Sequence, residues 1–197
     1  MTEPETLTLD WYGPIVPTEM DMSTQAMDRL GRPGVYLCLQ HYPDAHRVRA
    51  YAGVTKDFRL RLREHVAATM GLTYDIYDAE GRIVFAHTHA DSLYEAAARL
   101  DELHQLAADE VKRMTWFCAL DDSDSYVAWY VVEGMLIRRL KALAQTGFTT
   151  PAGDVLDVAN SRGGPKPDGA LVIRNQGADD VLNIFGAELT WLLEDAA

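Results

Sequence analysis

The 197-residue chain has few cysteines, few basic residues and no long apolar run. Its two cysteines, Cys38 and Cys118, exclude a disulfide framework, and because both fall in apolar segments we expect buried free thiols. No apolar stretch approaches the length of a membrane-spanning helix, and no basic region followed by an apolar run opens the chain, so we expect a cytoplasmic protein. Lys and Arg number 18 against 30 acidic residues, and the resulting net charge of -12 opposes binding to a polyanion.

The sequence also lacks internal repeats and low-complexity tracts. Hydrophobic residues make up 48% of the chain, which is enough to build a substantial core. This composition predicts one domain, residues 1–197, that carries an elaboration, in preference to two independent domains.

The most informative part of the chain begins with two predicted strands. Residues 34–40 and 47–55 are rich in β-branched and aromatic side chains, which is typical of strands. Residues 41–46, which separate them, have the turn chemistry of a hairpin.

A helix is predicted directly after this hairpin. Apolar residues recur every four positions there, as on the buried stripe of a helix: Phe58, Leu62 and Val66. Thr55 or Asp57 is available as the N-cap. Arg61 and His65 are also four residues apart, so they share one side of this helix, next to the apolar stripe and at the rim of the sheet.

Two further residues stand out downstream. Glu133 is the only charged residue between positions 126 and 137, and a charge on so apolar a helix is costly unless something pairs with it. The pairing partner is either a ligand or an arginine such as Arg61 or Arg138. Asn160 lies in a segment with the composition of a turn, where asparagine is common.

The order of these motifs resembles the GIY-YIG nuclease domain, which is found in homing endonucleases, some restriction enzymes and the excision-repair incision subunit. The elements that carry the resemblance are Gly34-Val35-Tyr36, Tyr51-Ala52-Gly53, Arg61 ten positions after Tyr51, His65 four positions later, Glu133 on its apolar helix, and Asn160. They cover roughly residues 30–165. The chain departs from the family pattern at Val54, where a lysine is frequent, and in the gap of 72 positions between Arg61 and Glu133, which indicates an insertion.

The resemblance implies a fold as well as a function. The expected fold is α+β and GIY-YIG-like, with a small, mostly antiparallel central sheet flanked by helices. Its core spans about residues 30–70 and 113–165, an inserted hairpin and helix span about 71–112, and a C-terminal strand and helix span about 166–197.

The implied function is that of a metal-dependent endonuclease, a hydrolase acting on phosphodiester bonds of nucleic acid, with DNA favoured over RNA. Glu133 would hold one divalent ion, Mg²⁺ or Mn²⁺, since hard oxygen ligands suit hard cations. Arg61 would bind the phosphoryl group, and Tyr36 or a water beside it would deliver the nucleophile. Tyr51 and His65 would orient groups or exchange protons, and the identity of the base stays open. Supporting roles fall to Gly34, Gly53 and Asn160.

The distribution of charge bears on the substrate. Residues 34–65 carry a net charge of +3 and residues 133–166 a net charge of +2, whereas residues 66–132 carry -8. A basic active face framed by acidic walls would favour a small, end-bound or single-stranded phosphodiester over a long duplex. Two alternatives remain open: the same fold repurposed as a small-molecule enzyme, and a non-catalytic interaction module whose acidic insertion contacts a protein partner.

The remaining segments predict the elaboration. Residues 73–77 and 82–87 suggest a second hairpin, and a capping box at Ser92 opens a helix with a leucine-rich stripe. A central strand is expected over 114–120, with Asp121 to Asp124 capping the helix of Glu133. A short strand over 170–174 and a closing helix over 178–194 complete the chain.

His87 and His89 form the one other pair with metal-ligand spacing. Alternate residues of a strand face the same way, so both imidazoles could bind Zn²⁺ or Ni²⁺. No third ligand is identifiable nearby, which favours histidines at the end of a hairpin without a metal.

Overall fold

The computed structural model of the protein describes residues 5–19, 28, 30–88, 92–120 and 126–191. In this part of the chain, seven strands form one curled sheet in the order β7-β3-β2-β6-β1-β8-β9. The strands are β1 (Glu5–Ile15), β2 (Gly34–Tyr42), β3 (Arg47–Thr55), β6 (Met114–Leu120), β7 (Val155–Val158), β8 (Leu171–Gly177) and β9 (Glu188–Trp191). The pairs β1/β8 and β3/β7 are parallel, whereas β2 pairs antiparallel with both β3 and β6.

The protein is α+β, but the predicted small, mostly antiparallel sheet was wrong, because the sheet has seven strands and is mixed. The first cause is β1, whose residues carried no prediction. Leu9 and Trp11 in β1 are buried while their neighbours Thr8 and Asp10 are exposed, as in a strand with one face on the core. β1 then joins β6 to β8, and so extends the sheet well beyond the predicted core.

The second cause is the C-terminal segment, where the predicted helix over 178–194 was also wrong. Helix α6 (Asp179–Phe185) ends after two turns at Gly186, whose φ of 78° lies in the left-handed region that glycine tolerates. The chain then reverses into β9, which pairs antiparallel with β8 at the edge of the sheet.

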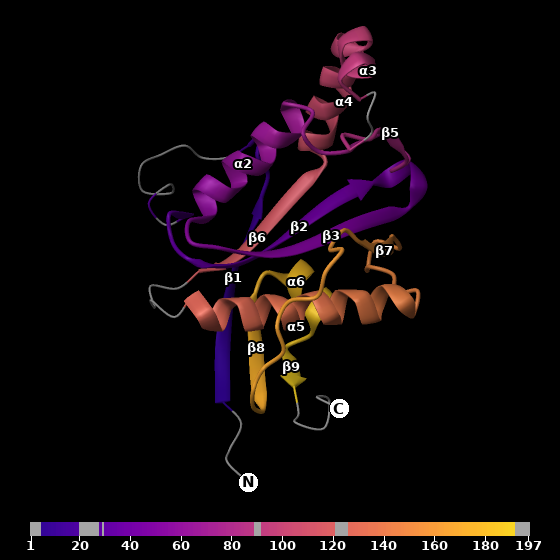
Figure 1. The fold of residues 1–197 in the computed structure, drawn as a ribbon. Helices are drawn as coiled ribbons and strands as arrows, with labels where there is room; N and C mark the ends of the chain where they lie inside the picture. The colour runs from indigo at the N-terminus through magenta and orange to yellow at the C-terminus, as the bar shows by residue number, and fades with distance from the viewer. Residues whose placement is uncertain (1–4, 20–27, 29, 89–91, 121–125, 192–197) are drawn as a thin grey trace.

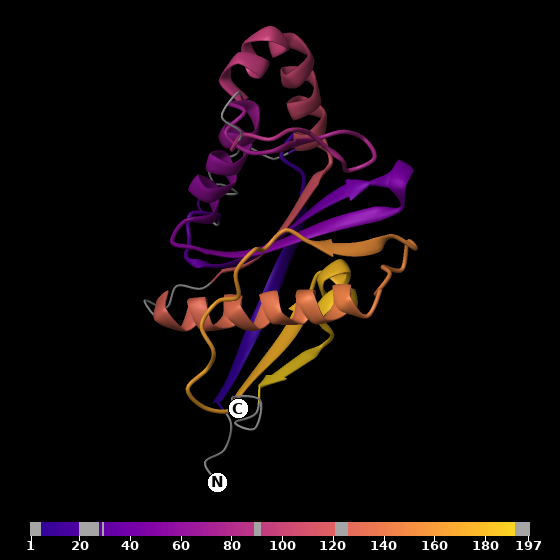
Figure 2. The same ribbon diagram turned by 45° about the vertical axis from the view of Figure 1, so that its right-hand side comes forward.

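Two helices cover opposite faces of the sheet (Figures 1 and 2). Helix α2 (Phe58–Met70) lies over one face, and helix α5 (Tyr126–Gln145) crosses the other. Alternate side chains of β2 therefore enter different cores. Val35 and Leu37 pack on the α5 side, while Tyr36 and Cys38 pack on the α2 side.

The insertion forms a separate layer at one end of the molecule. The predicted second hairpin is confirmed as β4 (Ile76–Tyr77) and β5 (Ile83–Phe85), which form their own two-stranded sheet. The single predicted helix is two, α3 (Ser92–Ala98) and α4 (Leu100–Lys112), which protrude together (Figure 2). A third small core of Ile76, Phe85, Leu103 and Ala107 holds α4 to the hairpin.

The remaining sequence predictions either agree with the structure or concern residues that it does not describe. The predicted turn between β2 and β3 contains a short 3-10 helix, η1 (Pro43–Ala45). The predicted caps at Asp121 to Asp124 lie outside the described residues. Both cysteines are buried free thiols, as expected. No helix within the described ranges has the length and apolar character needed to cross a membrane.

Candidate functional site

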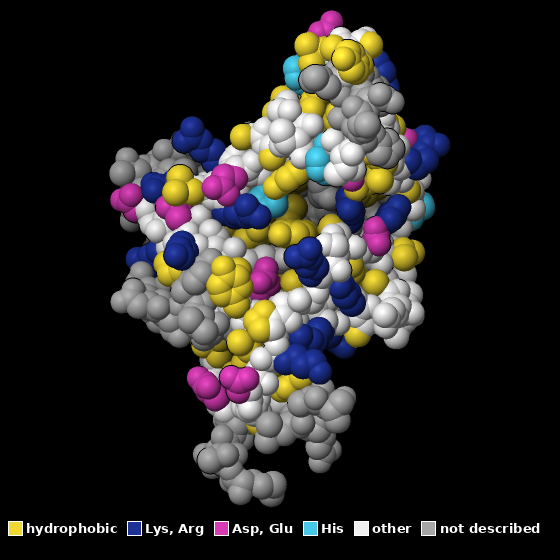
Figure 3. All heavy atoms as spheres, in the orientation of Figure 1, with side chains coloured by type: hydrophobic (Ala, Val, Ile, Leu, Met, Phe, Trp, Pro, Cys, Tyr) yellow, Lys and Arg dark blue, Asp and Glu magenta, His cyan; other side chains and the backbone are white. Residues whose placement is uncertain are grey.

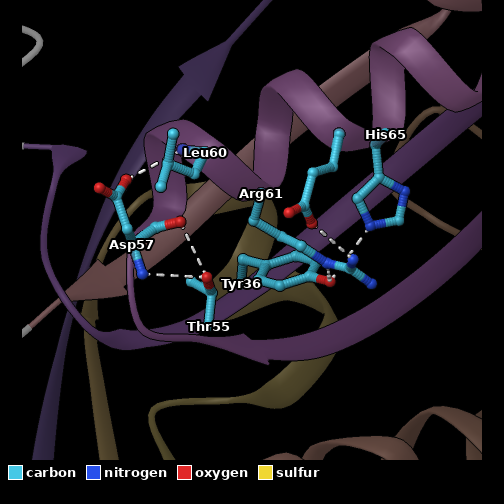
Figure 4. Close-up of polar contacts among 7 residues, drawn as sticks. Tyr36, Thr55, Asp57, Leu60, Arg61 and His65 are labelled. Atoms are coloured by element: carbon cyan, nitrogen blue, oxygen red, sulfur yellow. Dashed lines mark hydrogen bonds and ion pairs between the residues drawn. The ribbon is translucent and has the colours of Figure 1, made fainter.

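The hairpin and the helix that follows it bring three of the predicted site residues into hydrogen-bonding contact (Figure 4). Asp57 is the N-cap of α2, since its carboxylate accepts a hydrogen bond from the backbone N–H of Leu60 at 2.9 Å. This cap sets where the helix begins, and so places Arg61 and His65 one turn apart above the ring of Tyr36. The Tyr36 hydroxyl accepts a hydrogen bond from Arg61 Nε at 3.0 Å and lies 3.3 Å from His65 Nε2.

Gly53 explains how the Tyr36 ring fits on the sheet. The two residues are paired across β2 and β3, and a Cβ added at Gly53 would lie 2.4 Å from the Tyr36 hydroxyl oxygen. Only a residue without a side chain leaves room for the ring there. Gly34 has a related role, because a Cβ there would lie 2.1 Å from the carbonyl oxygen of Ala119 in β6.

The rings around Tyr36 form an aromatic cluster. The Tyr51 ring centroid lies 6.0 Å from that of Tyr36 and 5.7 Å from that of His65. Trp116 in β6, which the sequence analysis did not single out, lies 5.0 Å from His65 and 5.5 Å from Tyr36, centroid to centroid. These packed rings restrict the orientation of the imidazole and of both phenols.

Burial determines the protonation states in this cluster. Burial, with the Arg61 guanidinium adding to it, lowers the pKa of His65 to about 3, so the imidazole is neutral at pH 7. Burial raises the pKa of Tyr36 far above its ordinary value, and the phenol therefore keeps its proton. The Tyr36 oxygen accepts from Arg61, and its O–H can donate either to His65 or to the hydroxyl of Tyr51. A protonated phenol and a neutral imidazole thus lie within 3.3 Å of one another, beside the Arg61 guanidinium.

Glu133 approaches the same region from the opposite face of the sheet. It lies on α5, and its carboxylate accepts a hydrogen bond from the backbone N–H of Val54, the residue after Gly53 in β3. Burial raises its pKa, while the Val54 hydrogen bond and the charge of Arg61 oppose that rise. Glu133 and Arg61 thus come from helices on two faces of the sheet, and the charge of Arg61 reaches the Glu133 carboxyl.

Glu133 does not form the ion pair with Arg61 or Arg138 that was the alternative prediction. Arg61 Nη1 donates instead to Glu64 at 3.0 Å. Arg138 donates to the carbonyl oxygens of Gly164 at 2.6 Å and Pro165 at 3.0 Å. The carboxylate of Glu133 is half-buried, and its Val54 contact leaves further lone pairs for a ligand.

Asn160 holds the open edge of β3. β7 pairs with β3 only as far as Ala50, and beyond that point the Asn160 side chain takes over the pairing. Its Oδ1 accepts from the N–H of Ala52 at 2.9 Å and its Nδ2 donates to the Ala52 carbonyl at 2.8 Å. The side chain thus fixes the middle residue of the Tyr51-Ala52-Gly53 motif.

Whether the site can bind a divalent ion depends on which donor atoms it offers. No group of three or more His, Cys, Asp or Glu side chains suited to a metal ion occurs among the described residues. A single carboxylate with water molecules is nevertheless an ordinary way to bind Mg²⁺, and Glu133 supplies such a hard oxygen donor. Of the predicted histidine pair, His87 binds the carboxylate of Asp75 at 2.8 Å, and His89 lies outside the described residues.

The sequence analysis did not single out Glu110, a buried acid. It lies on the amphipathic helix α4, where a glutamate is expected to face solvent. It is only 3% exposed. Its two oxygens accept hydrogen bonds from Gln40 Nε2 at 3.0 Å and from the backbone N–H of Tyr77 at 2.9 Å. Burial raises its pKa to about 7, against the opposing effect of these two donors and of Arg113 and Arg49. The burial of Glu110 depends on the contact of the insertion with the sheet.

Comparison of the chain with protein-family models, with curated proteins and with solved structures found no match.

Proposed function

We propose that this protein is a metal-dependent phosphodiesterase that cleaves nucleic acid, of the GIY-YIG type that its motifs resemble. One observation carries the proposal: side chains from motifs spread over almost a hundred residues converge at one end of β2 and β3. Tyr36, Arg61 and His65 are hydrogen-bonded there and Tyr51 packs on them, while Glu133 comes from the opposite face of the sheet to Val54 of β3.

Each group has a role that its environment suits. Arg61 gives its Nε hydrogen to Tyr36 and one Nη1 hydrogen to Glu64, which leaves further N–H donors for a phosphoryl oxygen. A guanidinium that is already held by two partners needs little reorganisation when negative charge develops on the phosphate.

Proton transfer is assigned to Tyr36 and His65. The phenol is protonated and the imidazole is neutral, so a proton leaving the nucleophile can pass through Tyr36 to His65. A bound phosphate would raise the pKa of His65, because its negative charge favours the imidazolium. The site thereby becomes a better base when the substrate is present.

Glu133 is the residue that would hold a divalent ion, Mg²⁺ or Mn²⁺. Such an ion would neutralise charge on the phosphodiester. The raised pKa of Glu133 reflects a carboxylate taken out of water without a salt bridge, and a cation would offset that cost.

A small-molecule enzyme is the second candidate, and a pocket beside the site favours it. The pocket has a volume of about 310 Å³ and is lined by Tyr51 and His65 together with residues of the insertion. The net charge of -12 also disfavours a long polyanion. An interaction module without catalysis is the third candidate. The cytoplasm remains the expected compartment.

The experiment that tests the proposal is a cleavage assay. Purified protein is incubated at low salt with plasmid and with single-stranded oligonucleotide, in Mg²⁺, Mn²⁺ or EDTA. We expect cleavage that requires the metal and falls by roughly a hundredfold or more in Arg61→Ala and Glu133→Ala. Arg63→Ala, an exposed arginine on the same helix, is the matched control and should cleave like the wild type.

Two results would count against the proposal. Intact substrate in every lane would leave the nuclease without support and favour the small-molecule or interaction reading. Full activity of Glu133→Ala would assign the cleavage to another site or to a contaminant.

A further inference from the structure

The pocket beside the candidate site is formed where the insertion meets the sheet. Its sheet wall comes from β2, β3 and β6, and its other walls come from α2, α4 and the β4 hairpin. Histidine, hydrophobic and basic side chains lie side by side on this face of the molecule (Figure 3). Because Tyr51 and His65 line both the pocket and the aromatic cluster, a ligand in the pocket would adjoin Tyr36 and Arg61.

Flat aromatic rings make up much of the pocket lining. Tyr51, Tyr74, Tyr77 and Trp116 contribute to it. The Tyr74 ring lies 5.6 Å from the imidazole of His65, and the guanidinium of Arg49 lies 4.4 Å from the centre of the Tyr77 ring. Planar rings and a stacked guanidinium are the surfaces on which a nucleobase stacks, whatever its sequence.

Polar groups in the pocket lining can contact the edge of a nucleobase. Glu110 and Gln40 both line it and are hydrogen-bonded to one another. Each carboxylate oxygen of Glu110 accepts one hydrogen bond from the protein and can accept a second, and the Gln40 carbonyl oxygen is a further acceptor. An amide beside a buried carboxyl group suits the donors and acceptors of a base edge better than it suits a purely apolar ligand.

Size and charge restrict the ligand further. A volume of about 310 Å³ lies at the lower end of the range for small-molecule pockets, and it suits a ligand about the size of one nucleoside. Two acidic side chains, Asp75 and Glu110, line the pocket against one arginine, Arg49, and this balance favours a neutral base over a phosphate. The phosphate is therefore expected outside the pocket, on the side of Arg61.

We propose that this pocket binds one unstacked nucleobase of a single-stranded substrate, next to the phosphodiester that is cleaved at Tyr36 and Arg61. This inference rests on the proposed function and specifies its substrate. A base can enter such a pocket only when it is already unpaired or is flipped out of a duplex, and an unpaired base costs the least. The acidic surface of the insertion is compatible with this choice, because a single strand need not lie along the whole molecule.

The first test measures nucleoside binding without cleavage. Adenosine and cytidine are titrated into the protein by calorimetry, with ribose 5-phosphate as the ligand that lacks a base. We expect both nucleosides to bind and ribose 5-phosphate to bind at least about tenfold more weakly. Tyr74→Ala, at a residue 37% exposed on the pocket rim, should weaken nucleoside binding by roughly tenfold, whereas Tyr94→Ala, at a residue 78% exposed on α3, should not.

The second test uses cleavage. A single abasic residue is moved along a short single-stranded oligonucleotide, and the cleavage rate at each phosphodiester is compared with that of the intact strand. We expect cleavage next to the abasic residue to fall by about tenfold or more, with cleavage elsewhere unchanged.

The two tests separate this inference from the proposed function. If Arg61→Ala and the wild type bind nucleosides equally but neither cleaves any strand, the pocket assignment stands and the nuclease fails. If the wild type cleaves every abasic strand at the normal rate and binds no nucleoside, the pocket assignment is overturned and the nuclease stands.

Discussion

At the scale of single residues, the tyrosines and glycines of the two strand motifs depend on one another. Tyr36 can place its hydroxyl between Arg61 and His65 only because Gly53 leaves space beneath its ring. A glycine that permits an aromatic side chain to lie flat on the neighbouring strand is a packing requirement, and it is met here at the centre of the candidate site.

Gly53→Ala should therefore disable the site. The added methyl group would overlap the Tyr36 ring, and we expect cleavage to fall by roughly a hundredfold and the free energy of unfolding by about 1–3 kcal/mol. Gly163→Ala is the matched control, because a Cβ there would meet nothing within 4 Å. Cleavage assays and urea unfolding of both variants provide the measurement. Normal activity of Gly53→Ala would show that Tyr36 is not required where the structure places it.

Glu110 makes stability depend on pH. Its pKa is about 7 in the folded protein, raised by burial from an ordinary value of 4.5. Between these two values the folded state binds more protons than the unfolded state, so this residue makes stability fall as the pH rises from about 4.5 to about 7.

Glu110→Gln should remove this dependence. From pH 4.5 to pH 8, we expect the wild type to lose on the order of 2 kcal/mol relative to the variant. The measurement is urea unfolding of both proteins at a series of pH values. Parallel curves of stability against pH would mean that Glu110 titrates normally.

At the scale of elements, the end of β3 is hydrogen-bonded to a side chain and not to a neighbouring strand. Asn160 satisfies both backbone groups of Ala52 after β7 has ended. The same edge carries the Val54 N–H that donates to Glu133. Asn160 thus binds β3 between Tyr51, in the aromatic cluster, and Val54, which donates to Glu133.

Asn160→Ala should loosen this edge. Two hydrogen bonds are lost, and we expect a destabilisation of about 1–3 kcal/mol together with reduced cleavage. Asn183→Ala, at an exposed position of α6, should change neither. Stability is measured by urea unfolding and activity by the cleavage rate. An Asn160→Ala variant with wild-type stability and activity would contradict this role of the side chain.

At the scale of the whole molecule, charge limits how nucleic acid can bind. The net charge of -12 leaves only residues 34–65 and 133–166 positive, and these are the segments that carry the site. We expect the proposed nucleic-acid substrate to make few phosphate contacts, since each further contact would bring the polyanion toward acidic parts of the chain.

The salt dependence of binding should accordingly be shallow. For one or two phosphate contacts with a single strand, the slope of log affinity against log salt concentration is about -0.7 to -1.4. The KM for an oligonucleotide, measured from about 50 to about 200 mM salt, provides that slope. A slope steeper than about -4 would indicate an extended binding track and contradict a compact substrate site.

The sequence by itself determined the local parts of the site. The predicted strand over 47–55 coincides with β3, and the predicted strand over 34–40 falls within β2, because side-chain period and turn chemistry act over a few residues. The same spacing placed Arg61 and His65 on one side of α2. Glu133 was identifiable because a lone charge in an apolar segment has a cost that can be read without coordinates.

Only the tertiary structure decided the rest. The parallel pairing of β1 with β8 joins residues more than 160 positions apart, and no local pattern encodes it. The meeting of Glu133 with Val54 at the β3 edge, the burial of Glu110 and the pocket under the insertion depend on how separate elements pack. The environment of a side chain, and with it the pKa, is a property of that packing and not of the local sequence.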